Sequence, residues 1–134
     1  MAVDPQFAST PKVGAAIPGN AETSLTVPTL AAVVLTAGTN GSKVEEIVVE
    51  AVTTSLTPTT VAGLVYIFLY DGTTYHLFDT LAVTAVTAST TVPPFRTNKP
   101  YTNLLVPAGW SLRASQSIAG NASLLKVTAI GGDF

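Results

Sequence analysis

The chain has 134 residues, of which 47% are apolar and 10% are charged, and its formal net charge is −2 at pH 7. This length predicts a single domain, and six scattered Lys and Arg residues give no basic stripe that could neutralise nucleic-acid phosphates. The absence of cysteine excludes disulfides, and the longest strongly apolar run, residues 61–70, is about half the length of a membrane-spanning helix.

Residues 1–22 lack the apolar spacing of a helix or a strand. They mix Pro, Gly, Ala and Ser with isolated apolar side chains, and we expect no signal peptide in them. Terminal segments of this kind are ordered when another surface holds them. We therefore predict an extended docking arm whose single aromatic residue anchors it in a pocket. The candidate partner-binding residues of this arm are Pro5, Phe7, Pro11, Val13 and Ile17.

Residues 23–134 are predicted to form the domain. A short strand over residues 23–27 and a second strand over 30–37 precede a Gly-rich turn. Residues 43–54 are ambiguous, because their apolar positions fit one face of a helix as well as a strand. Five of these twelve residues are Val or Ile, so we favour a strand with a bulge near Glu45 and Glu46.

The middle of the chain predicts a hairpin. Residues 61–71 read as a central strand buried on both faces, and Asp71-Gly72 is typical of a tight turn. Residues 73–78 return with Tyr75 and Leu77 on one face, and residues 80–87 alternate as a further strand.

The C-terminal third predicts three more strands, over residues 102–106, 110–115 and 123–130, after a loop that ends at Lys99-Pro100. In the second of these, Trp110, Leu112 and Ala114 share one side. Seven to nine short strands at regular spacing predict an all-β fold, a single antiparallel β-sandwich of jelly-roll type.

Candidate chemistry is sparse. His76 is the single histidine, and a catalytic or zinc-binding role would need partners beyond Asp71 and Asp79, so we interpret it as a half-exposed strand residue. Glu45, Glu46 and Glu50 lie on one element and do not face each other across a cleft, as glycoside hydrolysis requires. The G-x-S-x-G motif of serine hydrolases is absent. We therefore expect a non-enzyme with no cofactor and no metal.

Three further residues are candidates for an interface. Arg96 and Lys99 are the one close pair of basic residues and could pair with the glutamates across a contact, and Phe134 ends the chain on an aromatic side chain.

Four segments resemble small structural proteins found in tailed-bacteriophage genomes. They are the opening MAVDPQFASTPK, the hairpin Asp71-Gly72-Thr73, the segment 106–115 (VPAGWSLRAS) and the ending IGGDF; residues 44–60 match least clearly. The resemblance implies a virion component, and first of all a capsid decoration (cement) protein. It further implies a β-sandwich on the capsid surface, assembled as a trimer, with the major capsid protein as partner.

Two alternatives stay open. One is a head-fibre base or a component of the tail tube or tip. The other is a carbohydrate-binding β-sandwich on the virion surface, in which Tyr66, Tyr70, Tyr75 and Trp110 would offer rings for stacking or would instead serve the core or an interface.

Overall fold

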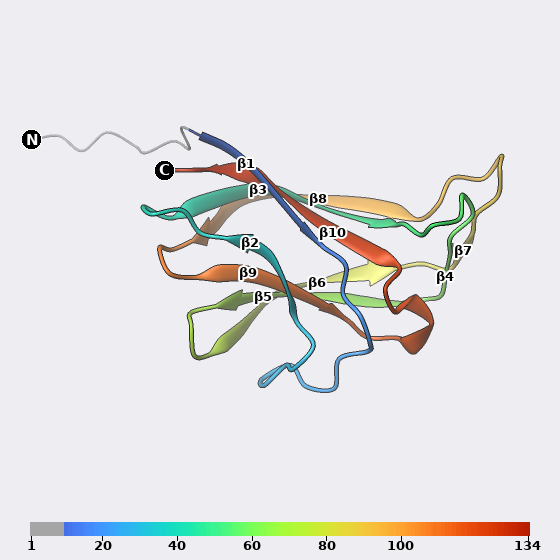
Figure 1. Ribbon diagram of the computed structural model, residues 1–134, viewed down its shortest axis with the longest axis horizontal. Helices are drawn as coiled ribbons and strands as arrows, with labels where there is room; N and C mark the ends of the chain where they lie inside the picture. The colour runs from blue at the N-terminus through green and yellow to red at the C-terminus, as the bar shows by residue number, and fades with distance from the viewer. Residues whose placement is uncertain (1–9) are drawn as a thin grey trace, which may run out of the picture.

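Residues 10–134 are the part of the chain that the computed structural model describes, and they form ten strands and one short 3-10 helix (Figure 1). The first sheet has the order β1-β10-β3-β8, formed by Thr10–Ala16, Leu125–Asp133, Ser42–Ala51 and Arg96–Val106. The second has the order β2-β9-β5-β6, formed by Ala32–Thr36, Ser111–Gln116, Gly63–Tyr70 and Tyr75–Val83. A two-stranded sheet joins β4 (Thr59–Thr60) to β7 (Val86–Thr87), and the helix η1 (Ala119–Asn121) precedes β10.

The two four-stranded sheets stack face to face, with β1, β10, β3 and β8 in one layer and β2, β9, β5 and β6 in the other (Figure 1). All the pairings within these sheets are antiparallel. The eight strands of these sheets cross from one layer to the other at every connection except the β5–β6 hairpin, and the first and last strands pair, which is the connectivity of an eight-stranded jelly roll. The predicted all-β sandwich is therefore confirmed.

The core lies between the layers and is built from alternating positions of the strands, because successive side chains of a strand point to opposite faces. In β3 the alternation is interrupted, since Val44 and Glu46 lie opposite the consecutive residues Gly131 and Ile130 of β10, which leaves Glu45 as an extra residue. Val44 therefore faces the core before the bulge, and Ile47 and Val49 face it afterwards. This shift explains the helix-like spacing of the apolar residues, and the predicted strand with a bulge is confirmed.

The N-terminal boundary of the sandwich differs from the prediction. Strand β1 pairs with β10 without a register shift, from Thr10 opposite Asp133 to Ala16 opposite Val127. Residues 10–16 are thus held by the chain's own last strand, and the boundary that the sequence suggested after residue 22 is wrong. Pro11 is compatible with this strand because β1 is at the edge of its sheet, where a missing N–H is tolerated. Pro5 and Phe7 lie outside the described residues.

A glycine brings the edge strands of the two layers together. In β2, Val34 is an extra residue between the paired positions Val33 and Leu35. A Cβ atom on Gly14 of β1 would overlap the backbone oxygen of Val34. The close approach of β1 to β2 therefore requires a residue without a side chain at position 14.

Two local predictions were wrong. Residues 23–27 form no strand, and Glu22 instead accepts hydrogen bonds from the backbone N–H groups of Thr29 and Leu30, which holds the segment as a loop. The loop expected at Lys99-Pro100 belongs to strand β8, where Pro100 is tolerated because β8 is an edge strand.

The packing at Gly14 makes a prediction for stability. We expect Gly14→Ala to lower the free energy of unfolding by about 1–3 kcal/mol, because the added methyl group forces the two edge strands apart. Gly19→Ala is the matched control, since a Cβ there meets nothing within 4 Å. Urea denaturation of the two variants and the wild type measures the difference. Equal stabilities of the two variants would contradict this account of how β1 is held.

Candidate functional site

The outer face of the second sheet carries the largest group of interacting aromatic side chains in the described residues. In β5, Val65 and Ile67 belong to the core, so the alternating Tyr66, Phe68 and Tyr70 lie on the opposite, outer face. The same reasoning applies to Arg113 in β9, because its neighbours Leu112 and Ala114 are core residues. Phe68 lies directly opposite Arg113 in the pairing of β5 with β9.

A bulge in β6 brings one more ring to this face. Leu77 pairs with Phe68 and Asp79 pairs with Ile67, so Phe78 is the extra residue. Before the bulge, the odd-numbered Tyr75 and Leu77 therefore lie on the outer face. After the bulge, the odd-numbered residues point into the core. The sequence predicted two separate strands over 73–78 and 80–87. Residues 75–83 instead form one strand, in which the odd-numbered side chains change from the outer face to the core at Phe78.

We call the residues Tyr66, Phe68, Tyr70, Tyr75 and Arg113 the aromatic–arginine face. Phe68 is fully buried and forms its floor. The ring of Phe68 lies 5.9 Å from that of Tyr75 in an edge-on arrangement and 6.5 Å from that of Tyr66. Tyr70 and Tyr75 stack with their centroids 4.3 Å apart. Such pairs contribute about 0.5–1.5 kcal/mol each beyond the burial of area.

Arg113 is fixed on these rings. Its guanidinium carbon lies 4.3 Å from the centroid of Tyr70 and 5.7 Å from that of Tyr75. Nε donates a hydrogen bond to Ser111 Oγ at 3.0 Å, and Nη1 donates to Tyr75 Oη at 3.1 Å. A guanidinium has five N–H donors, and Arg113 makes no ion pair with a carboxylate in residues 10–134. Three donors of a positioned cation are thus available to a ligand or partner.

Exposed apolar side chains belong to the same sheet. Val33 lies opposite Arg113 on β2, and Leu77 lies opposite Phe68 on β6. Their exposed fractions are 43% and 42%, and that of Leu64 on β5 is 39%. A half-buried arginine on an aromatic floor, flanked by exposed aliphatic groups, is a composition typical of binding surfaces.

His76 lies near this face but points to the other side of the strand. Its Nε2 atom is 3.1 Å from Asp71 Oδ2, and its ring stacks on Trp110 at 5.6 Å. Asp71 also accepts hydrogen bonds from the N–H groups of Thr73 and Thr74. The backbone N–H of Thr74, then that of Thr73, holds the pKa of Asp71 well below its usual range. The pair therefore closes the hairpin between β5 and β6, and His76 is the half-exposed strand residue that the sequence predicted.

Lys99 is engaged within the chain. Its Nζ atom lies 2.6 Å from Asp79 Oδ2, and Tyr101 Oη donates to the same oxygen at 2.8 Å. Burial alone raises the pKa of Asp79, but the hydrogen bonds from Lys99 and Tyr101 outweigh it, so the pKa is lowered. Burial and the bond to Asp79 raise the pKa of Tyr101. This cluster ties β6 to β8, the edge strands of opposite layers.

A second polar cluster ties the chain ends together. Lys12 Nζ lies 3.1 Å from Asp133 Oδ1, and Ser42 Oγ donates a hydrogen bond to Asp133. The Ser42 hydroxyl is the largest cause of the lowered pKa of Asp133, and Lys12 adds to it. Strands β1, β3 and β10 are therefore joined by side chains as well as by their backbones.

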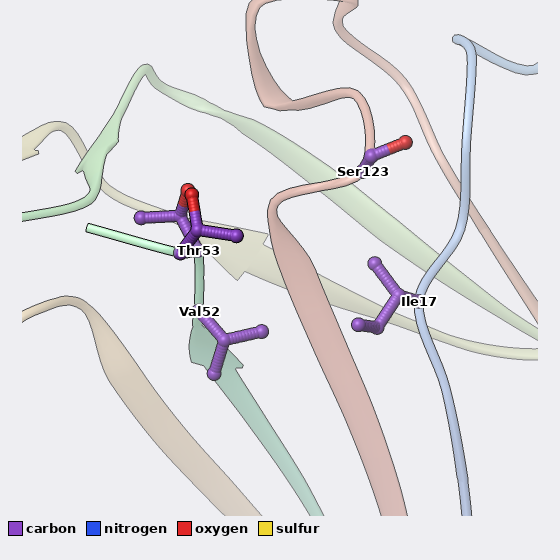
Figure 2. A pocket seen from close by; sticks show the side chains of 5 residues that line it. Ile17, Val52, Thr53 and Ser123 are labelled. Carbon is purple, nitrogen blue, oxygen red and sulfur yellow. The ribbon is translucent and has the colours of Figure 1, made fainter. Parts of the chain in front are cut away.

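The structure does not gather the other predicted interface residues into one site. Val13 on β1 is 66% exposed, whereas Arg96 begins β8 in the same sheet, opposite Glu50. The backbone N–H of Phe134 donates to Gly41 O at 3.2 Å. Ile17 lines a shallow depression of about 380 Å³ (Figure 2). The other residues that line it are Val52, Thr53, Thr54 and Ser123.

Sequence reasoning found part of the aromatic–arginine face. Tyr66, Tyr70 and Tyr75 were named as candidate stacking rings, and they do share this face. Trp110 was named with them, but it packs against the core and stacks on His76 instead. Arg113 was missed, although its alternation with Leu112 and Ala114 is a signal that it points outward.

Within residues 10–134, no group of three or more His, Cys, Asp or Glu side chains could hold a metal ion. In the same residues, no helix is long and apolar enough to span a membrane. Comparisons of this chain with family models, with curated proteins and with solved structures gave no match.

The aspartates predict a loss of stability in acid. The pKa values of Asp71, Asp79 and Asp133 are all lowered in the folded state, so the unfolded chain binds more protons as the pH falls below about 5. The stabilisation from these groups is complete above pH 5 and decreases steadily towards pH 2. Urea midpoints measured from pH 7 to pH 2.5 should follow this course.

Asp79→Asn tests the origin of the effect. The variant should be less stable at pH 7, because Lys99 and Tyr101 lose a charged partner, and its stability should fall less steeply in acid. Glu45→Gln is the control, since Glu45 is exposed. An acid profile of Asp79→Asn as steep as that of the wild type would assign the effect to other groups.

Proposed function

We propose that this protein is a non-enzymatic structural component of a virion, which binds the capsid lattice as a decoration protein. The resemblance of its opening, hairpin and C-terminal segments to small tailed-phage structural proteins supports this role. Among the structural observations, the aromatic–arginine face gives this proposal its main support. It supplies a prepared surface for a protein partner, which the proposal identifies as the major capsid protein.

The composition of this face suits docking to a protein. Tyr and Arg are enriched among the residues that dominate binding energy at interfaces. Here Arg113 is already ordered by Ser111 and Tyr75, so little side-chain entropy is lost when a partner binds. The low charge of the chain, 10% of residues, also suits a molecule that works among closely packed neighbours.

The proposed mechanism is mechanical. A decoration subunit that contacts two neighbouring capsid subunits raises the free energy needed to separate them. In a trimer the same contact occurs three times, and linked weak contacts give strong attachment through effective concentration. The sandwich suits this use because side-chain clusters join its layers at β6 and β8 and join β1 to β10.

A protein on the capsid surface and a protein at the tail are expected in different numbers of copies per particle. A decoration protein is present in hundreds of copies per particle, whereas a head-fibre base or a tail-tip component is present in few. Quantitative mass spectrometry of purified virions distinguishes the two versions of the proposal.

Arg113→Ala tests the docking face. We expect this variant to bind capsids at least tenfold more weakly in co-sedimentation with particles that lack the protein, as for central arginines at interfaces. Arg96→Ala is the matched control, because Arg96 is an exposed arginine on the other sheet. Circular dichroism and thermal unfolding verify that both variants are folded.

The reverse result, with Arg96→Ala weakened and Arg113→Ala unchanged, would place the contact on the first sheet. Absence of capsid binding by the wild-type chain would overturn the proposed function itself. Removal of the N-terminal segment in such experiments should stop at Ser9, because a longer deletion takes away strand β1.

Carbohydrate binding is a second candidate, favoured by the three tyrosines and the positioned arginine on one face. Jelly rolls occur in lectin domains as well as in viral capsids, so the fold alone does not choose between the two. Sugars bind by stacking on aromatic rings and by hydrogen bonds to groups such as the unused N–H donors of Arg113.

A glycan array tests this candidate. If it is correct, the wild type binds a defined glycan class, and Tyr66→Ala and Arg113→Ala each reduce that binding at least tenfold. Phe78→Ala is the control, because Phe78 is an exposed aromatic at the bulge that packs near Tyr101. No binding by the wild type, or equal losses in all three variants, would remove carbohydrate recognition as a candidate.

A further inference from the structure

We propose that the depression beside Ile17 receives Phe7 of a second copy of this chain. This inference rests on the proposed structural role, because an assembled virion component needs contacts between its own copies. The exchange of Phe7 supplies one such contact. The occupant is the N-terminal segment, residues 1–9, exchanged between copies.

The walls of the depression come from three parts of the chain. Ile17 follows β1, residues 52–54 follow β3, and Ser123 precedes β10, so the lining residues come from three separate segments (Figure 2). Backbone hydrogen bonds hold these parts in place, from Ser123 N to Pro18 O at 3.0 Å and from Val52 N to Leu124 O at 2.8 Å. The depression is therefore formed before any ligand arrives.

The lining suits an uncharged aromatic ring. None of the five lining residues is charged, and Ile17 and Val52 offer aliphatic surface next to the hydroxyl groups of Thr53, Thr54 and Ser123. A volume of about 380 Å³ is sufficient for one ring. Phe7 is the single aromatic residue among the first 22 residues of the chain, which makes it the natural anchor of the segment.

Chain length excludes the molecule's own Phe7. Strand β1 is extended and pairs with β10 without a register shift, so Thr10 and Ile17 are separated by about 23 Å at the rise of a β-strand. Phe7 is three residues from Thr10 and can lie at most about 11 Å from it. The ring therefore falls far short of its own depression, whereas a neighbouring copy can present the same segment.

The positions of the depression and of the Phe7 segment on the molecule are consistent with exchange between identical copies. The depression lies at one end of β1, and the segment that carries Phe7 joins the other end. Each copy thus offers a donor and an acceptor at separate places, an arrangement that closes into a ring when the rotation between copies is suitable. The exposed Val13 lies on β1 between the two ends and adds apolar surface along the path.

Cysteine pairs test the exchange, because the native chain contains no cysteine. Full-length Ala8→Cys, which keeps the Phe7 ring, mixed with full-length Thr53→Cys should form an intermolecular disulfide at least tenfold faster than Ala8→Cys mixed with Leu77→Cys. Leu77 is the control because it is exposed on the outer face of the other sheet. Equal rates for the two mixtures, or an intrachain disulfide in the Ala8→Cys/Thr53→Cys double variant, would overturn the proposal.

Sedimentation velocity gives an independent measurement. Phe7→Ala should weaken self-association at least tenfold relative to the wild type, whereas Val3→Ala, in the same segment, should change it little. Self-association that is equal in all three proteins would also overturn the proposal. These experiments use purified protein without capsids, so their failure leaves the Arg113 test of capsid docking unaffected, and failure of capsid docking leaves the exchange between copies unaffected.

Discussion

The side-chain alternation of the strands, reset at single extra residues, determines which residues form the core and which form the surface. In β3 the extra residue is Glu45, opposite β10, and in β6 it is Phe78, opposite β5. A shift by one residue moves every later side chain of a strand to the opposite face. Without the bulge in β6, either Tyr75 or the core residues Leu81 and Val83 would be on the wrong side. Core and aromatic–arginine face therefore depend on the same local irregularity.

The face that results is ordered by contacts within the chain. Phe68 is buried beneath Tyr66 and Tyr75, and Arg113 lies across Tyr70 with two of its donors already bonded. Side chains that are fixed before binding lose less entropy when a partner arrives, so the same contact area gives a higher affinity. This ordering distinguishes the aromatic–arginine face from the isolated exposed side chains elsewhere, such as Leu56, which have no comparable network in the described residues.

Local sequence patterns predicted those features of the fold that depend on neighbouring residues. A continuous apolar run located β5, apolar alternation located β9, Asp71-Gly72 located the hairpin, and the crowding of Val and Ile with broken periodicity located the bulge in β3. Features that depend on distant partners were not predictable in this way. Strand β1 is rich in small residues and is held by β10 from the far end of the chain, and Pro100 is accepted in β8 because that strand has a free edge. Arg113 reaches Tyr70 and Tyr75 through the pairing of β9 with β5, which no local pattern contains.

The placement of β1 changes how an N-terminal arm could act in an assembly. A long arm that is free to residue 22 would lose the entropy of ordering all of those residues on binding, at roughly 1 kcal/mol for each. With residues 10–16 already paired to β10, that cost falls on a much shorter segment. The sandwich also fixes where the segment starts, since Thr10 lies opposite Asp133 and the Lys12–Asp133 ion pair secures this end of the strand. In the proposed assembly, an arm that begins at this fixed point would contact only surfaces near Thr10, so its partner would be an adjacent subunit and not a molecule captured at random.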